Sequence, residues 1–159
     1  MPKSAITFSD TDHAIVAELR RNGRSTNQQI ADSLGLTAST VSSRIRRMED
    51  ANQLRVVAVS DFAALGYHVL MRIAVDVDGR ATSEVADELA QFPEIFACHI
   101  VTGRHDIDIL VGLHEFADLP RFLETLVSQV SGIRALIPSI TLDIVKYDFE
   151  VAPLEGMIR

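Results

Sequence analysis

Three closely spaced helix-start signals open the chain and constrain its fold more than any other feature. Ser9 is followed three residues later by Asp12, and Ser25 stands in the same relation to Gln28. In such pairs the hydroxyl and the second polar side chain each satisfy a backbone N–H at the first turn of a helix. Thr37 can cap a third helix with its hydroxyl. We therefore expect three short helices in the first third of the chain.

Apolar periodicity and two turn signals support this division. Asn22-Gly23 and Gly35 supply residues that readily adopt the left-handed conformation in which helices often end. The apolar side chains recur at helical spacing, and they are Ile15, Val16, Leu19, Ile30, Ala31, Leu34, Val41, Ile45 and Met48. A helix, a short turn at Gly35 and another helix form the helix-turn-helix pattern. The first helix would brace the other two as a trihelical core.

The third helix has an outward face suited to a DNA groove. Because its apolar residues face inward, hydroxyl side chains and arginines fall on or beside the opposite face. Small hydroxyls let a helix approach DNA closely, and arginines reach phosphates or guanine edges. Together with two residues at the second helix, the predicted DNA contacts are Thr26, Asn27, Thr37, Ser39, Thr40, Ser42, Ser43, Arg44, Arg46 and Arg47. The alternative is a solvated amphipathic helix in an ordinary helical domain.

Charge is divided unevenly along the chain. The formal net charge of the 159 residues is −7. Residues 1–55 hold eight Lys/Arg and six Asp/Glu, a net of +2, whereas residues 56–159 hold seven and sixteen, a net of −9. This asymmetry indicates two tasks, with the less acidic part facing a polyanion. We expect double-stranded DNA to be the partner of the first part.

Several classes of protein are disfavoured by what the sequence lacks. Cys98 is the only cysteine, which excludes an internal disulfide framework and a cysteine-based zinc site. Residues 1–9 show no signal peptide, and no apolar stretch approaches the roughly 20 residues that span a bilayer. We therefore expect a soluble cytoplasmic protein with no membrane partner. Cys98 and His99 would point to opposite faces of a strand, and we expect neither them nor His105 to bind a metal.

The remaining residues predict mainly strands, with two helices among them. A Val-rich strand over residues 54–60 leads into this part. The predicted elements are a strand over 67–77, a helix over 82–92, strands over 95–102 and 106–113, a helix over 119–130 and a strand over 139–149. The order βαββαβ is ferredoxin-like, and two helices would cover one face of a four-stranded antiparallel sheet. The other face is also apolar, which favours a twofold dimer with sheets face to face.

Both parts of the chain resemble the Lrp/AsnC regulators, the leucine-responsive and asparagine-responsive "feast/famine" proteins. The resemblance is carried by Ser9-Asp10-Thr11-Asp12, Asn22-Gly23-Arg24, Leu34-Gly35-Leu36-Thr37-Ala38-Ser39-Thr40-Val41, Arg44-Ile45, Met48-Glu49 and, in the second part, Val101-Thr102-Gly103-x-x-Asp106. Asn52 departs from the family, which usually has Gly after the third helix. Asparagine is the next best residue in the left-handed conformation, so the turn can survive.

The resemblance implies an α+β chain with three parts. Residues 1–53 would form an N-terminal (winged) helix-turn-helix DNA-binding domain, and residues 54–66 a linker strand and connection that pairs across a dimer. Residues 67–159 would form a ferredoxin-like domain for effector binding and oligomerisation. The protein would be a nucleoid-associated transcription regulator, active as a homodimer that assembles into a tetramer or octamer.

The resemblance also implies an effector, an amino acid or a related metabolite, bound at a seam between dimers and with no other cofactor. The implied effector-binding residues are Gly103, Arg104, His105, Asp106, Ser139, Ile140 and Thr141. The ammonium of an amino acid would pair with Asp106, and its carboxylate with Arg104 or with backbone N–H groups. The alternative is that Gly103 only makes a hairpin and Asp106 only caps it. Pro138 stands where a hydroxyl residue is more usual, which leaves the identity of the ligand open.

Two other functions share parts of this pattern. An architectural DNA-wrapping protein without an effector would need the same residues. Certain tetrapyrrole-pathway decarboxylases resemble both halves, but they would not need the basic, hydroxyl-rich third helix that this sequence keeps. Because the chain also lacks a Ser/His/Asp spacing, a paired-acid motif and a glycine-rich phosphate loop, we expect no enzymatic activity.

Overall fold

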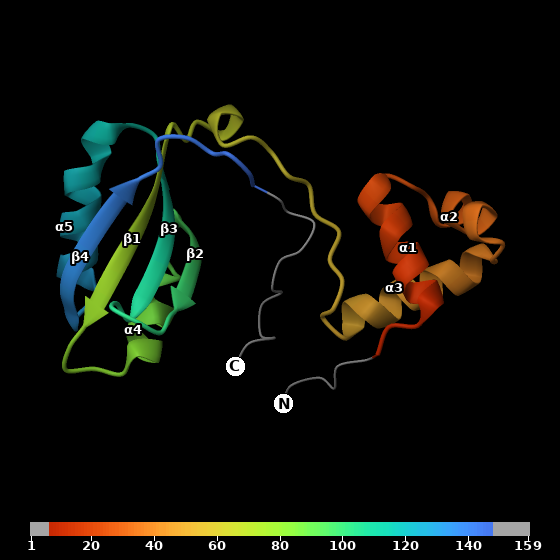
Figure 1. Ribbon diagram of the computed structural model, residues 1–159, viewed down its shortest axis with the longest axis horizontal. Coiled ribbons are helices and arrows are strands. Elements are labelled where there is room, and N and C mark those ends of the chain that lie inside the picture. The colour runs from red at the N-terminus through yellow and green to blue at the C-terminus, as the bar shows by residue number, and fades with distance from the viewer. Residues whose placement is uncertain (1–6, 148–159) are drawn as a thin grey trace. The chain divides into compact units, whose positions relative to one another are not determined.

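The computed structural model describes residues 7–147, which fall into two compact units (Figure 1). Residues 7–59, with 146 and 147, form the helical unit, and residues 60–145 form the sheet unit. Each unit has a hydrophobic core of its own.

The helical unit consists of α1 (Asp10–Arg21), α2 (Asn27–Leu34) and α3 (Ala38–Asp50). The predicted start of α1 is confirmed. The hydroxyl of Ser9 accepts the N–H of Asp12, and the Asp12 carboxylate accepts the N–H of Ser9. This reciprocal cap satisfies two backbone donors that the helix itself leaves unpaired.

The start of α2 lies one residue later than predicted. Its N-cap is Thr26, whose hydroxyl accepts the N–H of Gln29 at 3.2 Å while its own N–H donates to the Gln29 side chain at 2.8 Å. Ser25 belongs instead to the turn that ends α1, because its N–H donates to the carbonyl of Asn22. The expected pairing of Ser25 with Gln28 is therefore wrong, although the type of cap is right.

Two residues in the left-handed conformation shape the turns of the helical unit. Gly35 ends α2 with a φ of 66°, and Asn52 follows α3 with a φ of 56°. Asparagine thus takes the conformation that glycine adopts most easily. The three helices enclose a core of residues that are at most 1% exposed, namely Ile15, Ile30, Ala31, Val41 and Met48.

Residues 54–60 do not form the predicted strand. They carry no regular secondary structure, and Val56, Val57 and Val59 are exposed. A strand needs the N–H and C=O groups of a neighbour, and no strand of the described chain pairs with this segment. The prediction is wrong for the single chain for that reason.

The sheet unit has the predicted βαββαβ order (Figure 1). Its elements are β1 (Val69–Val77), α4 (Thr82–Leu89), β2 (Ile95–Ile100), β3 (Ile107–Leu113), α5 (Leu119–Gln129) and β4 (Ile133–Ile140), with short 3₁₀ helices η1 (Ala63–Leu65) and η2 (Phe116–Asp118). The strands are antiparallel in the order β2-β3-β1-β4, and α4 and α5 lie on one face of the sheet. The ferredoxin-like arrangement is confirmed.

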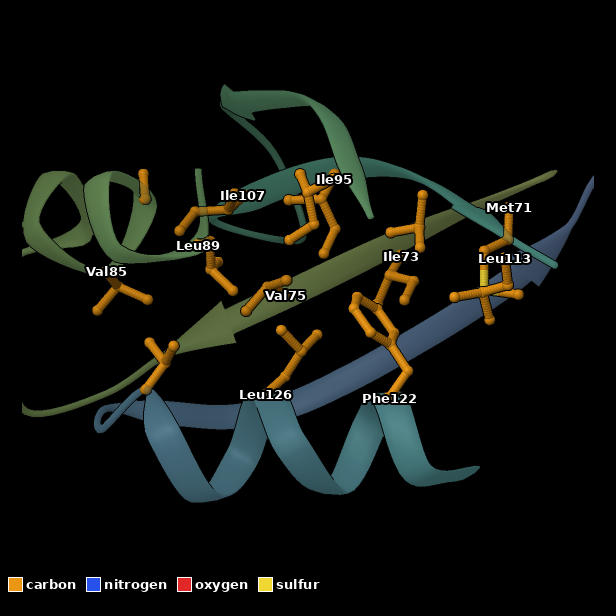
Figure 2. Close-up of a cluster of buried hydrophobic side chains, with 14 residues drawn as sticks. Met71, Ile73, Val75, Val85, Leu89, Ile95, Ile107, Leu113, Phe122 and Leu126 are labelled. Atoms are coloured by element: carbon orange, nitrogen blue, oxygen red, sulfur yellow. The ribbon is translucent and has the colours of Figure 1, made fainter. Parts of the chain in front are cut away.

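The core of the sheet unit lies between the sheet and its two helices. Met71, Ile73 and Val75 of β1 are fully buried, as alternation along a strand predicts. Figure 2 shows these side chains on the side of the sheet where α4 and α5 pack. The other large residues of this core include Val85, Leu89, Ile95, Ile107, Ile109, Val111, Leu113, Phe122 and Leu126.

The last strand lies earlier than predicted, since β4 begins at Ile133 rather than at Ser139. Gly132, with a φ of 87°, turns the chain back soon after α5. Its carbonyl accepts the N–H of Asp78 at 2.9 Å, which fastens this turn to the end of β1. Residues 148 and 149 of the predicted strand lie outside the described residues.

Pro138 is accommodated inside β4 because its nitrogen faces away from the sheet. The N–H of Thr141 donates to the carbonyl of Leu70, and hydrogen-bonded pairs alternate along an antiparallel ladder. By this alternation Pro138, which lies opposite Ile73, falls in a pair without ladder bonds. Since β4 is also an edge strand, the missing N–H removes no bond from the sheet. Pro138 therefore lies within β4 and does not mark its start, contrary to the prediction that the strand begins at Ser139.

The sheet face opposite the helices is mixed rather than uniformly apolar. Leu110 and Ile137 lie on it, because they alternate with core residues of β3 and β4. Arg72 and Asp108 also lie on this face and form an ion pair at 2.7 Å. The expectation of an apolar second face therefore holds only in part.

Candidate nucleic-acid interface and effector region

The N-terminus of α3 carries a cluster of hydroxyl groups. Thr37 caps the helix, since its hydroxyl accepts the N–H of Thr40 at 3.2 Å. The same hydroxyl lies 3.0 Å from Ser39 Oγ and 2.9 Å from Thr40 Oγ1. Ser43 Oγ donates to the carbonyl of Thr40 at 3.1 Å. Because these side chains are short and polar, the N-terminus of α3 can approach a DNA backbone closely.

One side of α3 is polar and open to solvent. Six of its residues line a shallow surface hollow, namely Ser39, Ser42, Ser43, Arg46, Arg47 and Asp50. Arg46 is exposed, and it forms no ion pair or hydrogen bond with another residue of the described chain. Its guanidinium can therefore meet a phosphate or a guanine edge without breaking an existing contact.

The other side of α3 is fastened to α1 through Asp12, whose side chain is 0% exposed. Asp12 Oδ1 accepts a hydrogen bond from Arg44 Nη1 at 3.0 Å, and Oδ2 accepts one from Arg47 Nη2 at 2.6 Å. Ser9 donates its hydroxyl to Oδ2 at 2.7 Å and its N–H at 2.9 Å. We call Ser9, Asp12, Arg44 and Arg47 the Asp12 cluster.

The Asp12 cluster keeps the buried carboxyl ionised. Burial raises the pKa of Asp12, but the hydrogen bonds from Ser9 and Arg44 and the charge of Arg47 outweigh burial. Together they lower the pKa from 3.8 to about 2. A buried carboxylate is tolerated only when it is paired in this way.

The prediction that Arg44 and Arg47 face outward is therefore only partly right, because both guanidinium groups also bind Asp12. The Arg44 side chain is 31% exposed, and its Nη1 also donates to Ser9 Oγ at 3.0 Å. The Arg47 side chain is 49% exposed and reaches both Asp12 and the outward hollow. Of the three arginines predicted on α3, only Arg46 lies entirely on the solvent side.

Asp12 was not predicted as the partner of these arginines. A signal was available in the helical spacing of α1. Asp12 precedes Ile15, Val16 and Leu19 by three, four and seven residues, so it falls on the same inward face. An acidic side chain on that face needs a buried cation.

The two predicted contacts on α2 stand at its N-terminus. Thr26 is the N-cap and its hydroxyl is engaged in that cap, whereas Asn27 is exposed as the first residue of the helix. The first turn of a helix presents unpaired N–H groups and the positive end of the helix dipole, which favour a phosphate.

In the sheet unit, the loop between β2 and β3 is held to β1 by Asp106. Its N–H donates to the carbonyl of Val75 at 3.1 Å, and its carboxylate accepts the N–H of Val77 at 2.8 Å. Gly103 has a φ of 126°, which a side chain rarely tolerates, so the hairpin requires glycine here. The alternative that Gly103 only makes a hairpin and Asp106 only caps it thus has direct support. One carboxylate oxygen of Asp106 is already bonded within the loop, to the N–H of Val77.

Asp76 is a further polar residue of this region that the sequence analysis missed. It accepts hydrogen bonds from His105 Nδ1 at 2.8 Å and from Arg134 Nη2 at 3.0 Å. Arg104, by contrast, is exposed and forms no bond with another described residue. Arg104 is therefore the loop side chain best able to receive a carboxylate. The sequence around Asp76 does not indicate this role, because a polar residue on the outer side of a strand is common.

The two halves of the predicted effector site lie apart within one chain. Residues 139–141 lie along the start of β1, where Ile140 is opposite Met71. Residues 103–106 lie at its other end, beside Val75 and Val77. At about 3.3 Å a residue, the separation along the strand is roughly 13 Å or more. The two segments are therefore not adjacent within one chain.

Residues 7–147 contain no group of three His, Cys, Asp or Glu side chains that could hold a metal ion. No helix in that range is long and apolar enough to cross a membrane. Cys98 packs against α4, with its Sγ 3.6 Å from the carbonyl of Ala86. Burial, with a smaller effect of the nearby Asp87 charge, raises the pKa of the Cys98 thiol to about 11.

Both units are similar to known protein families. Residues 8–55 match a winged helix-turn-helix DNA-binding family, and residues 69–151 match the Lrp/AsnC ligand binding domain. An uncharacterized HTH-type transcriptional regulator of Pyrococcus horikoshii is 31% identical over 146 residues, which cover 91% of this chain and 92% of that relative. The chain belongs to the Lrp/AsnC family of transcriptional regulators.

Solved structures show the same fold as this Lrp/AsnC chain. A transcriptional regulator from Neisseria meningitidis, in complex with L-methionine, has a TM-score of 0.81 at 21% identity and covers 92% of this chain and 97% of its own. AsnC of E. coli has a TM-score of 0.77 at 20% identity and covers 90% and 97%. The predicted succession of a DNA-binding helix-turn-helix and an Lrp/AsnC ligand-binding domain is confirmed.

Proposed function

We propose that this Lrp/AsnC protein binds operator DNA with α3 in the major groove, and that an amino acid or a related metabolite modulates its DNA occupancy or assembly. The observation that carries the proposal is the outward side of α3. There, hydroxyl side chains share one solvent-facing surface with Arg46, which has no partner among residues 7–147, while the opposite side is fixed to α1. The regulators among its relatives support a cytoplasmic, nucleoid-associated regulator rather than an enzyme.

The DNA contacts divide by chemistry. Ser39, Ser42 and Ser43 can donate to phosphates or bases at close range, and Arg46 can reach a guanine edge or a phosphate. Asn27, at the start of α2, is suited to a phosphate. The net charge of +2 over residues 1–55 favours this part of the acidic chain as the docking surface.

The mixed face of the sheet is the proposed dimer surface. Leu110 and Ile137 offer apolar area on it, and Arg72 with Asp108 offers a paired charge that stays satisfied when covered. A second copy placed face to face would bury this area with twofold symmetry. A dimer is also what two half-sites on DNA require. Tetramers or octamers would follow from contacts between dimers.

The effector is proposed to be an amino acid that binds between dimers. The L-methionine complex of the N. meningitidis regulator supports this class of ligand. Arg104 would take the carboxylate, and the Asp106 oxygen that does not accept from Val77 would take the ammonium. Residues 139–141 of another copy would complete the site. A ligand that contacts two copies shifts the assembly equilibrium by its preference for the assembled state.

A salt-dependent gel-shift titration tests the DNA proposal. The duplex is the region upstream of the protein's own gene, and a random duplex of equal length is the reference. We expect a clear preference for the upstream duplex, which Arg46→Ala weakens by about tenfold or more. Arg121→Ala is the matched control, because Arg121 is an exposed arginine on α5. Equal affinity for both duplexes at moderate salt would refute operator binding.

A further inference from the structure

Asp12 is the single charged residue with a buried side chain among residues 7–147. Both of its carboxylate oxygens are occupied, one by Arg44 and the other by Arg47 and Ser9. The two arginines are 32 and 35 residues further along the chain, so these bonds join α1 to α3. Capping α1 explains the bonds with Ser9, but it does not explain the two guanidinium groups.

We propose that Asp12 is a positioning residue for DNA recognition, which sorts the three arginines of α3 into distinct roles. Arg44 is held against α1 and does not contact DNA. Arg47 is held by one nitrogen and presents the rest of its guanidinium to DNA. Arg46 contacts DNA and has no partner in the part of the chain that the structure describes. The inference rests on the proposed entry of α3 into DNA.

The exposed fractions of the Arg44 and Arg47 side chains support this order. The Arg44 side chain is 31% exposed and its Nη1 is shared between Asp12 and Ser9. The Arg47 side chain is 49% exposed and lines the outward hollow together with Arg46. A guanidinium has five N–H donors in a fixed fork. Arg47 can therefore bond the buried carboxylate and an external phosphate at the same time.

The same geometry limits how α3 can rotate against α1. Arg44 and Arg47 are three residues apart on one side of α3, and both end on a single carboxylate. A rotation of α3 about its axis would pull at least one guanidinium from a buried charge, which is costly. Asp12 thus fixes the direction in which Ser39, Ser42 and Arg46 face, although it lies on another helix.

The test compares four variants of the full chain, at a temperature where circular dichroism shows each to be folded. The variants are Asp12→Asn, Arg44→Ala, Arg46→Ala and the control Asp10→Asn. Asp10 is exposed in the first turn of α1, so its variant removes the same charge outside the cluster. For each variant, affinity for the upstream duplex and for a random duplex is measured over a range of salt concentrations.

We expect Arg46→Ala to reduce the slope of log affinity against log salt by about 1 for each recognition helix that contacts DNA. Arg44→Ala should leave the slope unchanged. Asp12→Asn should reduce the ratio of specific to random affinity by about tenfold, because α3 is less well oriented. The affinity for random DNA should not fall, because the variant also removes one negative charge. Asp10→Asn should leave the ratio unchanged. A variant that was only less stable would alter neither quantity under these conditions.

Three results would overturn the inference. If Arg44→Ala reduces the slope as much as Arg46→Ala does, Arg44 contacts DNA. If Asp12→Asn and Asp10→Asn have the same ratio, Asp12 only caps and stabilises. If Arg46→Ala changes nothing, Arg46 does not contact DNA and the inference fails, whereas the proposed function fails only if the wild type also shows no preference for the upstream duplex. Should Asp12→Asn not fold, Ser9→Ala replaces it, since it removes bonds to both Asp12 and Arg44 without changing charge. It should lower the same ratio, and an unchanged ratio would contradict the proposal.

Discussion

Gly132 lies directly against the side chain of Arg80, so that a Cβ at Gly132 would come within 3.0 Å of Arg80 Cδ. Arg80 is held in place because its guanidinium donates to Glu88 at 2.7 Å and to Ser131 Oγ at 2.9 Å. The hydrogen bond from Arg80 also lowers the pKa of Glu88. The turn after β1 and the turn before β4 are thus tied together at one end of the sheet.

The first prediction concerns this contact. Gly132→Ala should reduce the free energy of unfolding by about 1–3 kcal/mol, because it adds a side chain at a φ of 87° and collides with Arg80. Gly79→Ala is the matched control, since Gly79 has a φ of 72° with open space around it. Urea denaturation measures both. Equal losses would show that the Arg80 contact adds nothing to the cost of the backbone conformation.

The Asp12 cluster predicts a specific acid response of the helical unit. Because the pKa of Asp12 is about 2 when folded, against an ordinary 3.8, the unfolded chain binds the proton first as the pH falls. The stabilisation is therefore complete above about pH 5 and is lost progressively as the pH falls through 3.8 toward 2 and below. Asp12→Asn should cost about 2 kcal/mol near neutral pH. Its difference from the wild type, followed by urea denaturation, should shrink over that acid range. A difference that stays constant down to the lowest pH would contradict the paired state of Asp12.

Cys98 is predicted to be unreactive in the folded protein. With a pKa of about 11, its thiol carries very little thiolate at mildly alkaline pH, and the thiolate is the reactive form. A thiol-specific disulfide reagent should react at least about tenfold more slowly with the folded protein than with the protein in urea. The reaction is followed by absorbance. Similar rates in both states would mean that Cys98 is neither buried nor shifted.

The proposed dimer surface can be separated from the rest of the sheet unit by one pair of variants. Leu110→Asp replaces apolar area on the mixed face with a carboxylate that would have to be desolvated in a dimer, so it should convert the proposed dimer to monomers in light scattering after gel filtration. Val127→Asp makes the same change on the exposed side of α5, where Val127 is 57% exposed, and should leave the mass unchanged. A dimer that survives Leu110→Asp would place the interface elsewhere.

Arg104 and Asp106 of the loop between β2 and β3 are expected to affect ligand-free stability differently. Arg104→Ala should leave the ligand-free melting temperature nearly unchanged, because Arg104 has no partner among the described residues. It should abolish the rise in melting temperature that an amino acid produces in the wild type. Asp106→Ala should lower ligand-free stability by about 1 kcal/mol, because Val77 loses its acceptor. A thermal-shift screen of amino acids measures all three proteins. If no amino acid stabilises the wild type, the proposed class of effector is wrong.

Features with strong local signals could be predicted from the sequence. The Ser9–Asp12 cap, the left-handed Gly35 and the alternation of Met71, Ile73 and Val75 each depend on residues a few positions apart. Neighbouring residues decide such features before any tertiary contact forms. The helix-turn-helix and the order of strands and helices followed from them.

Features that depend on distant partners could not be predicted in the same way. The segment over 54–60 has the composition of a strand but no partner strand within the described chain. Arg44 and Arg47 have the periodicity of outward residues, yet Asp12 on another helix draws both of them inward. The two segments of the predicted effector site lie toward opposite ends of β1 in one chain, a separation that no local pattern in the sequence indicates.

Pro138 has a consequence for behaviour at high concentration. The outer rim of β4 lacks a donor at the position where an incoming β-strand from another molecule would need one, so the rim is a poor template for cross-β growth. Open-ended growth by addition of strands from other copies is therefore hindered at the free edge of β4.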